Sequence, residues 1–387
     1  DGQFSNAVHM CTGVGECRKL SGGTMCPSFR ATRDEEHSTR GRANALRLAM
    51  SGQLEEGLTG PRVYEALDLC LSCKACKSEC PSNVDMAKLK SEVWQLRYDE
   101  HGAGRRDRLI RDSAAMAARL ACPLAPLVNA AQRSPLFRSS LEKVAGIDRR
   151  RILPAYAREP FSRWYARHYR PLDTPKGAVA LYADTYLNYH EPEIGIAAVQ
   201  LLQGMGYDVE LAEVGCCQRP RISNGFLREA KAAGTQTAAG LDDYLQRGIP
   251  VLVCEPSCTS ALTEDLPDLI DDTALAGRLK AGVFMIDQFV ADALEPESPE
   301  DTGMAGQAHR RVLVHGHCHQ KAIYGTQAMM RVLRRLPGLT VEEIPSGCCG
   351  MAGSFGYERE HYELSRKIGE ETLLPAVREA HPEAMIV

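Results

Sequence analysis

The chain has 387 residues, a formal net charge of -4 and 15 cysteines. This length predicts two or three domains with sizeable cores, and the weakly acidic balance argues against a nucleic-acid binder, whose footprint would be basic. Cysteines this numerous and this clustered are typical of a reducing compartment in which thiols bind metal. No run of about 18 apolar residues occurs, so the sequence predicts no transmembrane segment.

Three cysteines lie near the start of the first predicted domain, residues 1–133. Cys11, Cys17 and Cys26 end in a Cys-Pro pair, like one half of a two-cluster ferredoxin with one cysteine missing. The chain opens with Asp-Gly-Gln rather than methionine, so we expect a fragment or a processed piece.

Helices are predicted between the cysteine clusters. The capping box at 32–35 predicts a helix over about 34–51, and further helices are predicted from Pro61 and over about 84–100. Helices between cysteine loops predict an α-helical ferredoxin-like module. The basic stretch 37–42 is interpreted as a solvated helix face, with an anion or partner site as the alternative.

The stretch that ends at Pro81 carries the most specific motif. Cys70, Cys73, Cys76 and Cys80 form C-x2-C-x2-C-x3-C-P, the iron–sulfur run of bacterial ferredoxins. A zinc knuckle is the alternative, but zinc sites usually use separated C-x2-C pairs. In two-cluster ferredoxins, the fourth thiol of such a run ligates the other cluster.

This crossing rule predicts one complete [4Fe–4S] site and a second site that is one ligand short. The complete site consists of Cys26, Cys70, Cys73 and Cys76. The second consists of Cys11, Cys17 and Cys80. Three outcomes stay open at the second site: a three-iron cluster, a non-cysteine ligand such as His9, or no metal.

A connecting strap is predicted over residues 134–176. Several prolines interrupt its periodicity. Phe161, Trp164, Tyr165 and Tyr169 make it too aromatic for a free linker, so we expect it to pack on a neighbouring element.

Residues 177–387 are predicted to form an α/β domain of two duplicated cysteine-rich βαβ repeats. The pairs Cys216-Cys217 and Cys348-Cys349 lie 132 residues apart, an offset typical of internal repetition. Alternating strands and helices predict parallel sheets with right-handed crossovers. The predicted strands cover about 178–182, 208–214, 251–253, 311–314, 340–344 and 384–387.

The candidate metal ligands of these repeats lie in loops after strand ends, where open α/β sheets bind ligands. They are Cys216, Cys217, Cys254, Cys258, Cys318, Cys348, Cys349, His317 and His319. Adjacent cysteines suit different irons of a cluster, or thiol–disulfide chemistry, and buried apolar packing is the alternative. His317 and His319 alternate with His315 on an extended segment, so we expect all three on one side; ordinary hydrogen bonding is the alternative.

The second repeat stops before its last cysteine loop. The residue 37 positions after Cys217 is Cys254, whereas the residue 37 positions after Cys349 is not cysteine. We therefore expect the natural protein to continue and this half-site to be incomplete here.

Six motifs along the chain carry a family resemblance. They are Cys11-Thr-Gly-Val-Gly-Glu-Cys17-Arg, Met25-Cys-Pro-Ser28, Ser38-Thr-Arg-Gly-Arg42, the Cys70–Pro81 run, Glu191-Pro-Glu193 and Gly347-Cys-Cys-Gly-Met-Ala-Gly-Ser-Phe355. Together they resemble the C-terminal iron–sulfur half of FAD-linked D-2-hydroxyacid dehydrogenases of the D-lactate and D-2-hydroxyglutarate type. The chain is also similar to the glycolate oxidase iron–sulfur subunit and to the iron–sulfur subunit of anaerobic glycerol-3-phosphate dehydrogenase. Its cysteine-rich (CCG) part is similar to that of heterodisulfide reductase.

Two departures from this pattern concern the CCG repeats. Asp184-Thr185 stands where a repeat of this kind begins with cysteine, and the second copy lacks its final cysteine loop. Both departures argue against a double cluster of the heterodisulfide-reductase kind.

The resemblance implies an electron relay within an oxidoreductase. A flavin would oxidise a D-2-hydroxyacid, and electrons would leave singly through the [4Fe–4S] site to a quinone, a flavoprotein or another carrier. No flavin-binding pattern is visible, so FAD is expected on a domain preceding Asp1 or on a separate flavoprotein subunit. We expect a cytoplasmic protein; peripheral association with the inner face of the membrane and homo-oligomerisation stay open, and no catalytic residue is assigned.

Two rival functions stay open. In the first, the CCG repeats form a thiol–disulfide oxidoreductase of the heterodisulfide-reductase kind, which needs a substrate disulfide near the cysteine pairs. In the second, the cysteines hold zinc in a non-catalytic interaction module.

Overall fold

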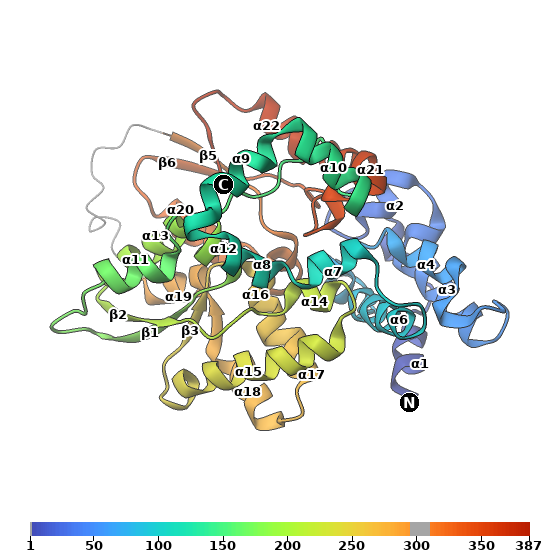
Figure 1. The fold of residues 1–387 in the computed structure, drawn as a ribbon, viewed down its shortest axis with the longest axis horizontal. Coiled ribbons are helices and arrows are strands. Elements are labelled where there is room, and N and C mark those ends of the chain that lie inside the picture. The colour runs from blue at the N-terminus through green and yellow to red at the C-terminus, as the bar shows by residue number, and fades with distance from the viewer. Residues whose placement is uncertain (1, 295–309) are drawn as a thin grey trace. The chain divides into compact units, whose positions relative to one another are not determined.

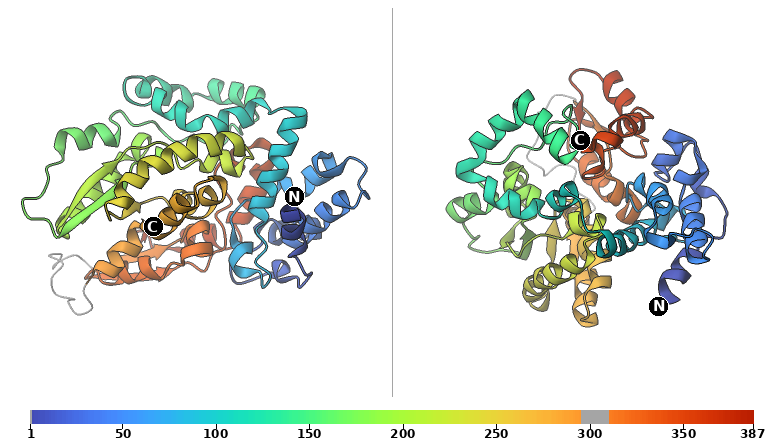
Figure 2. Two further views of the ribbon diagram at one scale, coloured as in Figure 1. Left: turned by 90° about the horizontal axis from the view of Figure 1, so that it is seen from below. Right: turned by 45° about the vertical axis from the view of Figure 1, so that its right-hand side comes forward.

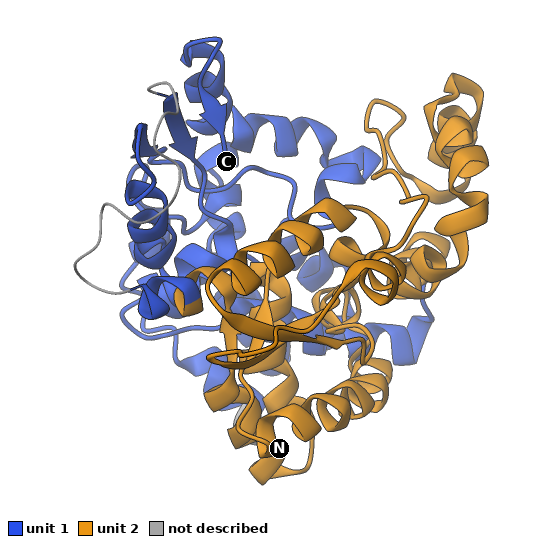
Figure 3. Ribbon diagram, turned by 90° about the vertical axis from the view of Figure 1, so that its left-hand side faces the viewer, with its two compact units in different colours: residues 1–103, 290–387 blue, residues 104–289 orange. Residues whose placement is uncertain are grey.

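The computed structural model describes residues 2–294 and 310–387 (Figure 1). The chain forms two compact units, which Figure 3 colours separately. The first unit contains residues 1–103 and 290–387, and the second contains residues 104–289. The boundaries predicted after residues 133 and 176 fall inside the second unit, and the two predicted repeats are divided between the units. The three-part division therefore stays a prediction.

The N-terminal part of the first unit is helical. Its α-helices are α1 (Gly2–His9), α2 (Pro27–Thr32), α3 (Thr39–Met50), α4 (Pro61–Asp68), α5 (Ala75–Glu79) and α6 (Met86–His101). Three short 3-10 turns lie between them, namely η1 (Glu16–Arg18), η2 (Glu35–His37) and η3 (Gly57–Thr59). Their shared core contains Leu46, Leu67 and Val93 together with the cysteines of both predicted ferredoxin halves.

The predicted helix start near residue 34 was wrong. Asp34 caps the separate turn η2 by accepting a hydrogen bond from the backbone N–H of Glu36. The hydroxyl of Ser38 then accepts from the backbone N–H of Gly41 and begins α3 at Thr39. The segment 34–50 is therefore divided into two helical pieces, because Asp34 and Ser38 each accept a hydrogen bond from a free backbone N–H in the first turn of the piece that follows.

The C-terminal part of the first unit is a small parallel sheet with helices, shown in orange to red in Figure 1. The strand order is β6-β5-β7, with β5 (Arg310–Val314) between β6 (Leu339–Glu343) and β7 (Met385–Ile386). The helical segments are η6 (Gln320–Tyr324), α20 (Gln327–Arg334), η7 (Phe355–Tyr357), η8 (Arg359–His361), α21 (Tyr362–Gly369) and α22 (Leu373–Glu379). Ala31 and Leu71 share a buried cluster with Cys348 and Phe355, so this part packs directly on the N-terminal helices.

The second unit contains a four-stranded parallel sheet in the order β2-β1-β3-β4. Its strands are β1 (Gly177–Tyr182), β2 (Tyr207–Ala212), β3 (Val251–Val253) and β4 (Val283–Met285). The register pairs Gly177 with Tyr207 and Ala180 with Val251. The sequence predicted the first three strands, and the parallel arrangement is as expected. It missed β4, which is only three residues long.

The remaining helical segments belong to the second unit, apart from the end of α19. They are α7 (Arg105–Arg111), α8 (Ser113–Leu120), η4 (Cys122–Leu124), α9 (Ala125–Arg133), α10 (Pro135–Ala145), α11 (Phe161–His168), α12 (Thr185–Tyr189), α13 (Pro192–Gly204), α14 (Arg219–Ser223), α15 (Leu227–Gln246), α16 (Pro256–Ser260), η5 (Ala261–Asp265), α17 (Leu266–Leu269), α18 (Thr273–Gly282) and α19 (Ile286–Ala293). The long helix α15 runs along the sheet in Figures 1 and 2.

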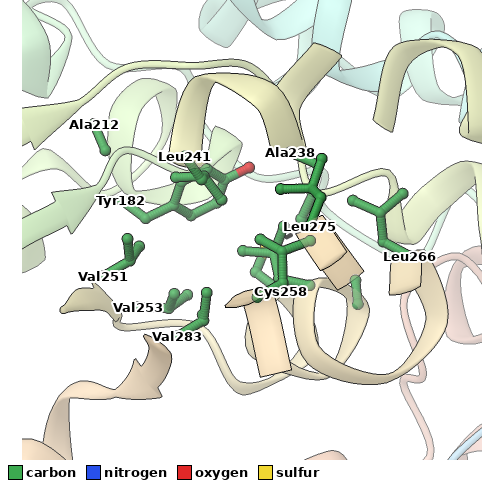
Figure 4. Packing of buried hydrophobic residues seen from close by; sticks show 14 of the residues in the cluster. Tyr182, Ala212, Ala238, Leu241, Val251, Val253, Cys258, Leu266, Leu275 and Val283 are labelled. Atoms are coloured by element: carbon green, nitrogen blue, oxygen red, sulfur yellow. Dashed lines mark hydrogen bonds between the residues drawn. The ribbon is translucent and has the colours of Figure 1, made fainter. Parts of the chain in front are cut away.

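Two apolar clusters cover the two faces of this sheet. One joins Tyr182 and Val251 to Leu241 of α15 and to Cys258 (Figure 4). The other joins Val179 to Phe161 of α11, and the hydroxyl of Tyr165 donates to the carbonyl of Val209 at 2.5 Å. The aromatic strap therefore packs on a neighbour as predicted, because burying its rings against the sheet offsets the cost of ordering it.

Candidate functional site

The four cysteines predicted to hold the complete cluster line a single pocket of about 330 Å³. They are Cys26, Cys70, Cys73 and Cys76. All are free thiols, and three of them come from one short loop while the fourth comes from a segment 44 or more positions earlier in the chain. The structure thus brings the predicted ligand set together.

Local backbone geometry orients these thiols. Cys26 is the N-cap of α2, with Pro27 at the first helical position, where a proline fits because its missing N–H is not needed. Ser72 and Lys74 have φ values of 52° and 59°, so the loop curls twice into the left-handed region, which non-glycine residues seldom adopt. The carboxylate of Glu79 accepts from the backbone N–H of Thr24 at 2.6 Å and fastens the segment leading to Cys26 against the cysteine run.

A buried arginine contacts this site directly. Arg42 is 1% exposed, and its guanidinium donates to Cys26 Sγ at 3.3 Å, to Ser28 Oγ at 2.7 Å and to the Ala66 carbonyl at 2.9 Å. The interpretation of stretch 37–42 as a solvated helix face was therefore wrong for Arg42. Its position on α3 turns it inward, and three acceptors satisfy a charge that would be costly to bury alone.

A second buried cation lies on the other side of the loop. Lys90 of α6 donates from Nζ to the carbonyls of Asp68 at 3.1 Å and Cys70 at 2.8 Å. Burial raises the pKa of the Cys73 and Cys76 thiols well above the usual range. Metal binding requires such thiols as thiolates, and nearby positive charges offset the cost of burying negative sulfur. Four convergent thiols and two buried basic side chains fit a thiolate-bound [4Fe–4S] cluster.

The three remaining ferredoxin cysteines line a second pocket of about 270 Å³. They are Cys11, Cys17 and Cys80. Thr12 Oγ1 and Ser82 Oγ are 3.0 Å apart and join the two loops, while the backbone N–H of Arg40 donates to Cys17 Sγ at 3.4 Å. This hydrogen bond is of the kind that tunes a cluster thiolate.

In the described part of the chain, no fourth cysteine lines the second pocket. His9, the predicted alternative ligand, is absent from its lining, and its Nδ1 lies 2.7 Å from the Ser5 carbonyl. Val14 lines the pocket instead and is 65% exposed. Two residues separate it from Cys11 on one side and two from Cys17 on the other, which gives the pattern C-x2-V-x2-C. The sequence analysis missed this position, although the spacing alone could have identified it as the one at which a ferredoxin run carries cysteine.

The second CCG repeat lies against the first pocket's cysteine loop. His319 Nε2 is 3.0 Å from the carbonyl oxygen of Ser72. Burial, then the nearby Cys318, raises the pKa of Cys73, while the hydrogen bond with Cys349, then burial, then nearby cysteines that include Cys73, raise the pKa of Cys348. Lys321 donates from Nζ to the carbonyls of Ser346 and Gly347 and holds the loop before the cysteine pair. Thiols of the two predicted modules are therefore neighbours within the first unit.

The three histidines of this repeat do not form one row. His315 Nδ1 is 2.6 Å from Ser346 Oγ, whereas His319 faces Ser72. The backbone becomes helical at Cys318, so the alternation expected of an extended segment ends there. The hydrogen bond with Cys348, with a further contribution from His315, lowers the pKa of Cys349 to about 3 and favours its thiolate.

The first CCG repeat forms a separate thiol cluster in the second unit. Cys217 Sγ and Cys258 Sγ are 2.8 Å apart and buried. Arg219 fastens their two loops, with Nε donating to the Ser257 carbonyl at 3.1 Å. Cys216 packs against the same apolar cluster, and its hydrogen bond with Cys217, then burial, raises its pKa. Cys254 packs instead against the apolar cluster on the other face of the sheet, and burial raises its pKa.

Asp184 is a residue of this cluster that the sequence analysis named only as a departure from the family pattern. Its Oδ1 caps α12 by accepting from the backbone N–H groups of Tyr186 and Leu187, while its buried Oδ2 has no hydrogen-bond partner among the residues that the structure describes. Burial raises its pKa to about 7, and its charge adds to burial in raising the pKa of Cys254 and Cys258. Its place directly after a buried strand was the signal that could have identified it.

The cysteine groups do not have the geometry of a single-ion site. Within residues 2–294 and 310–387, no group of three or more His, Cys, Asp or Glu side chains converges on a point where one metal ion could sit. A structural zinc site needs four ligands around one ion. The cysteines of the ferredoxin-like part instead line two pockets, as ligands of different irons do.

Comparison with protein families matches two parts of the chain. Residues 7–84 match the 4Fe-4S dicluster domain, and residues 312–387 match the cysteine-rich domain named CCG. These matches confirm iron–sulfur clusters as the predicted cofactors. Which thiols hold them stays a prediction, as does the duplication of the CCG repeat. No solved structure matches the chain.

Several characterised proteins are similar to the chain. A subunit of the anaerobic glycerol-3-phosphate dehydrogenase of Escherichia coli is 29% identical over 75% of this chain and 72% of that protein. D-2-hydroxyglutarate dehydrogenase of Pseudomonas putida is 26% identical over 95% of this chain, which spans only 40% of that protein. Lactate utilization protein A of Geobacillus kaustophilus is 29% identical over 46% of the chain and 73% of that protein. The resemblance stated from the motifs is thus confirmed.

Proposed function

We propose that this chain, which carries a 4Fe-4S dicluster domain and a CCG domain, is the electron-transferring iron–sulfur part of a flavin-dependent dehydrogenase. Cys26, Cys70, Cys73 and Cys76 would hold one [4Fe–4S] cluster, which when bound supplies a one-electron carrier. The observation that carries the proposal is the convergence of these four thiols on one pocket beside buried Arg42 and Lys90.

The residues around this pocket have defined tasks in the proposal. Arg42 holds a positive charge 3.3 Å from Cys26 Sγ, which favours the more negative, reduced state of the site. Leu71 and Met86 line the same pocket and are buried, so they keep water from the thiolates. Glu79 and His319 hold the loops that present Cys26 and Cys73.

The electron donor and the substrate follow from the related proteins. We propose that electrons come from FAD on a flavoprotein subunit or on another domain of the same protein. The substrate class is a D-2-hydroxyacid, supported by a D-2-hydroxyglutarate dehydrogenase that aligns with 95% of this chain. A quinone is the proposed acceptor, which would place a cytoplasmic protein at the inner face of a membrane.

We further propose metal at the other cysteine groups. Cys11, Cys17 and Cys80 would hold a second cluster, and the CCG cysteines with Asp184 would hold further iron–sulfur or thiolate metal. The nearness of Cys318 and Cys348 to Cys73 supports an electronic connection between the CCG repeat and the first pocket.

One observation favours a second candidate function, thiol–disulfide chemistry. Cys217 and Cys258 are close enough that loss of two protons and two electrons would join them as a disulfide. In this alternative, protein reduced with dithionite would turn over an added small disulfide, and a Cys217→Ser variant would not.

The experiment that tests the proposed function uses the full chain purified without oxygen. Brown absorbance should bleach with dithionite and return when a water-soluble quinone analogue is added. A Cys73→Ser variant should lose most of this signal, while a Cys122→Ser variant should keep it, since Cys122 lines neither pocket. Colourless protein with stoichiometric zinc would contradict the proposal and support the interaction-module alternative.

A further inference from the structure

One stretch of the second unit exposes large apolar side chains to an unusual degree. Six of them lie between residues 124 and 152, on η4, α9, α10 and the following turn. They are Leu124, Leu127, Leu136, Phe137, Val144 and Ile152. Leu136 is 84% exposed and Leu127 is 72% exposed. We call this surface the 124–152 face. The helices that carry it, α9 and α10, lie at one edge of the second unit in the ribbon views of Figure 2.

The exposed residues follow helical periodicity. On α9 the exposed positions include Leu127, Ala130 and Arg133, and on α10 they include Leu136, Ser140 and Val144. Positions three, four or seven residues apart share one side of a helix. Each of the two short helices therefore presents one mixed apolar and basic side outward and packs its other side on the unit.

The charge around this surface is opposite in sign to that of the chain. Residues 113–158 contain eight arginines or lysines and two acidic residues, giving a net charge of +6 in a chain whose total is -4. Both acidic side chains form ion pairs: buried Asp148 lies 2.7 Å from Arg150, and Glu142 lies 3.6 Å from Arg149. Arg133 and Lys143 have no ion pair with any residue in the described part of the chain. The exposed charges of this face are therefore all basic.

We propose that the 124–152 face docks on an anionic lipid bilayer. Leucine and phenylalanine on one side of short helices, flanked by arginine and lysine, are the composition of segments that lie in the membrane interface. Basic residues near the surface are attracted to anionic headgroups. Among the described residues no single helix is long and apolar enough to cross a bilayer; Ser113–Leu120 and Cys122–Arg133 pass that test only as a pair bent by 75°.

Charge complementarity selects lipid over a protein partner. Arginine is enriched at protein interfaces too, so the choice rests on leucines that protrude far enough to insert between headgroups and on a surface whose exposed charges are all basic. Only the consequence of docking rests on the proposed function: a protein seated on a membrane can reach a lipid-soluble quinone. Docking itself does not depend on it.

The test is co-sedimentation of the full chain with vesicles of phosphatidylcholine alone or mixed with phosphatidylglycerol. We expect the mixed vesicles to bind at least about tenfold more tightly, with a loss of affinity at high salt as surface charges are screened. Equal affinity for both vesicles, or binding to neither, would overturn the proposal; binding to neither would leave this face to a protein partner.

Paired variants separate the apolar and electrostatic parts. Changing Leu127→Ser with Leu136→Ser, or Arg133→Glu with Lys143→Glu, should each weaken binding to mixed vesicles about tenfold or more. The matched controls change exposed residues elsewhere in the second unit, namely Ile194→Ser with Leu201→Ser and Lys231→Glu with Lys280→Glu. Equal losses in variants and controls would overturn the assignment of this face.

A spectroscopic readout separates this inference from the proposed function. The face variants should keep the dithionite-bleachable absorbance, which also shows that they fold. If the electron-transfer proposal fails while docking holds, unmodified protein will bind mixed vesicles but lack that absorbance.

Discussion

The imidazole Nε2 of His319 lies 3.0 Å from the backbone carbonyl of Ser72, although 247 positions separate the two residues in the chain. Ser72 immediately precedes Cys73, so this contact places the second CCG repeat directly on the loop that presents three of the four thiols of the first pocket. The cysteine-rich repeat is thus part of the environment of that site, because its Cys318 adds to burial in raising the pKa of Cys73.

Replacing Arg42 should lower the reduction potential of the first site. In Arg42→Gln the guanidinium charge beside Cys26 is lost, and the reduced state loses more stabilisation than the oxidised state. We expect a fall of roughly 50–150 mV, since a charge a few ångströms away at an effective dielectric constant of about 20 is worth a few kcal/mol and about 59 mV is a tenfold change for one electron.

Redox titration followed by EPR measures this fall. Arg42→Lys should recover part of the potential, and the exposed Arg62→Gln should leave it unchanged. An unaltered potential in a folded Arg42→Gln protein with full iron content would show that the arginine only supports the fold.

Adding a cysteine at position 14 should complete the second site. Val14→Cys creates the spacing C-x2-C-x2-C at the pocket lined by Cys11, Cys17 and Cys80. If a three-iron cluster occupies this site, the variant should gain about one iron atom per chain and lose the EPR signal of the oxidised sample. Leu20→Cys, at another exposed position, is the control and should change neither. A Val14→Cys protein with unchanged iron would argue that the second site holds no cluster.

The first unit should lose stability as the pH rises above neutrality because of His361. Its Nε2 lies 2.8 Å from Asp68 Oδ2. Its Nδ1 lies 3.1 Å from Glu358 Oε2, and this second contact is an ion pair without hydrogen-bond geometry. Burial lowers the pKa of His361, but the two carboxylates outweigh it and raise the pKa to about 9. A raised pKa contributes stability that is fully present below about pH 6.5 and is lost as the pH rises through 9.

The contribution of His361 to the free energy of unfolding is about 2–4 kcal/mol, from the difference between its pKa in the folded protein and the ordinary histidine pKa. Denaturant unfolding between pH 6 and 10 should show it in the unmodified protein, and His361→Gln should be less stable at pH 6 with a flatter profile. His381→Gln, at an exposed histidine, is the control. A profile that stays equally steep in His361→Gln would assign the pH dependence to other groups.

Replacing Asp184 by asparagine should stabilise the metal-free second unit at high pH. Burial raises the pKa of this carboxyl to about 7, so its contribution to stability is lost as the pH rises from about 4 through 7. The amide of Asp184→Asn would keep an oxygen for the cap of α12 and remove the buried charge, which should add about 2–4 kcal/mol at pH 8. Thermal unfolding of both proteins with and without chelator checks this.

The exposed Asp271→Asn variant is the control for that measurement. If Asp184 helps to hold metal, Asp184→Asn should instead destabilise the metal-loaded protein. Equal stability of both forms at every pH would contradict the burial argument.

The sequence predicted which four cysteines line the first pocket, because cysteine spacing is itself the chemical requirement of a cluster loop. It also predicted the parallel strands, since a short apolar run between two helices, such as Val251–Val253, is typical of a buried strand in a parallel sheet. It could not predict that Arg42 turns inward, because a charged residue on a short helix ordinarily faces water and only the packing of α3 decides otherwise. Nor could it predict the contact of His319 with Ser72, which local patterns do not encode.

EPR of the dithionite-reduced full chain, combined with iron analysis, tests whether Cys26, Cys70, Cys73 and Cys76 hold one iron–sulfur cluster. We expect a [4Fe–4S]⁺ signal that disappears in Cys70→Ser and persists in Cys122→Ser. A signal that survives the loss of Cys70 and Cys26, or iron-free protein that holds zinc in its place, would contradict this assignment.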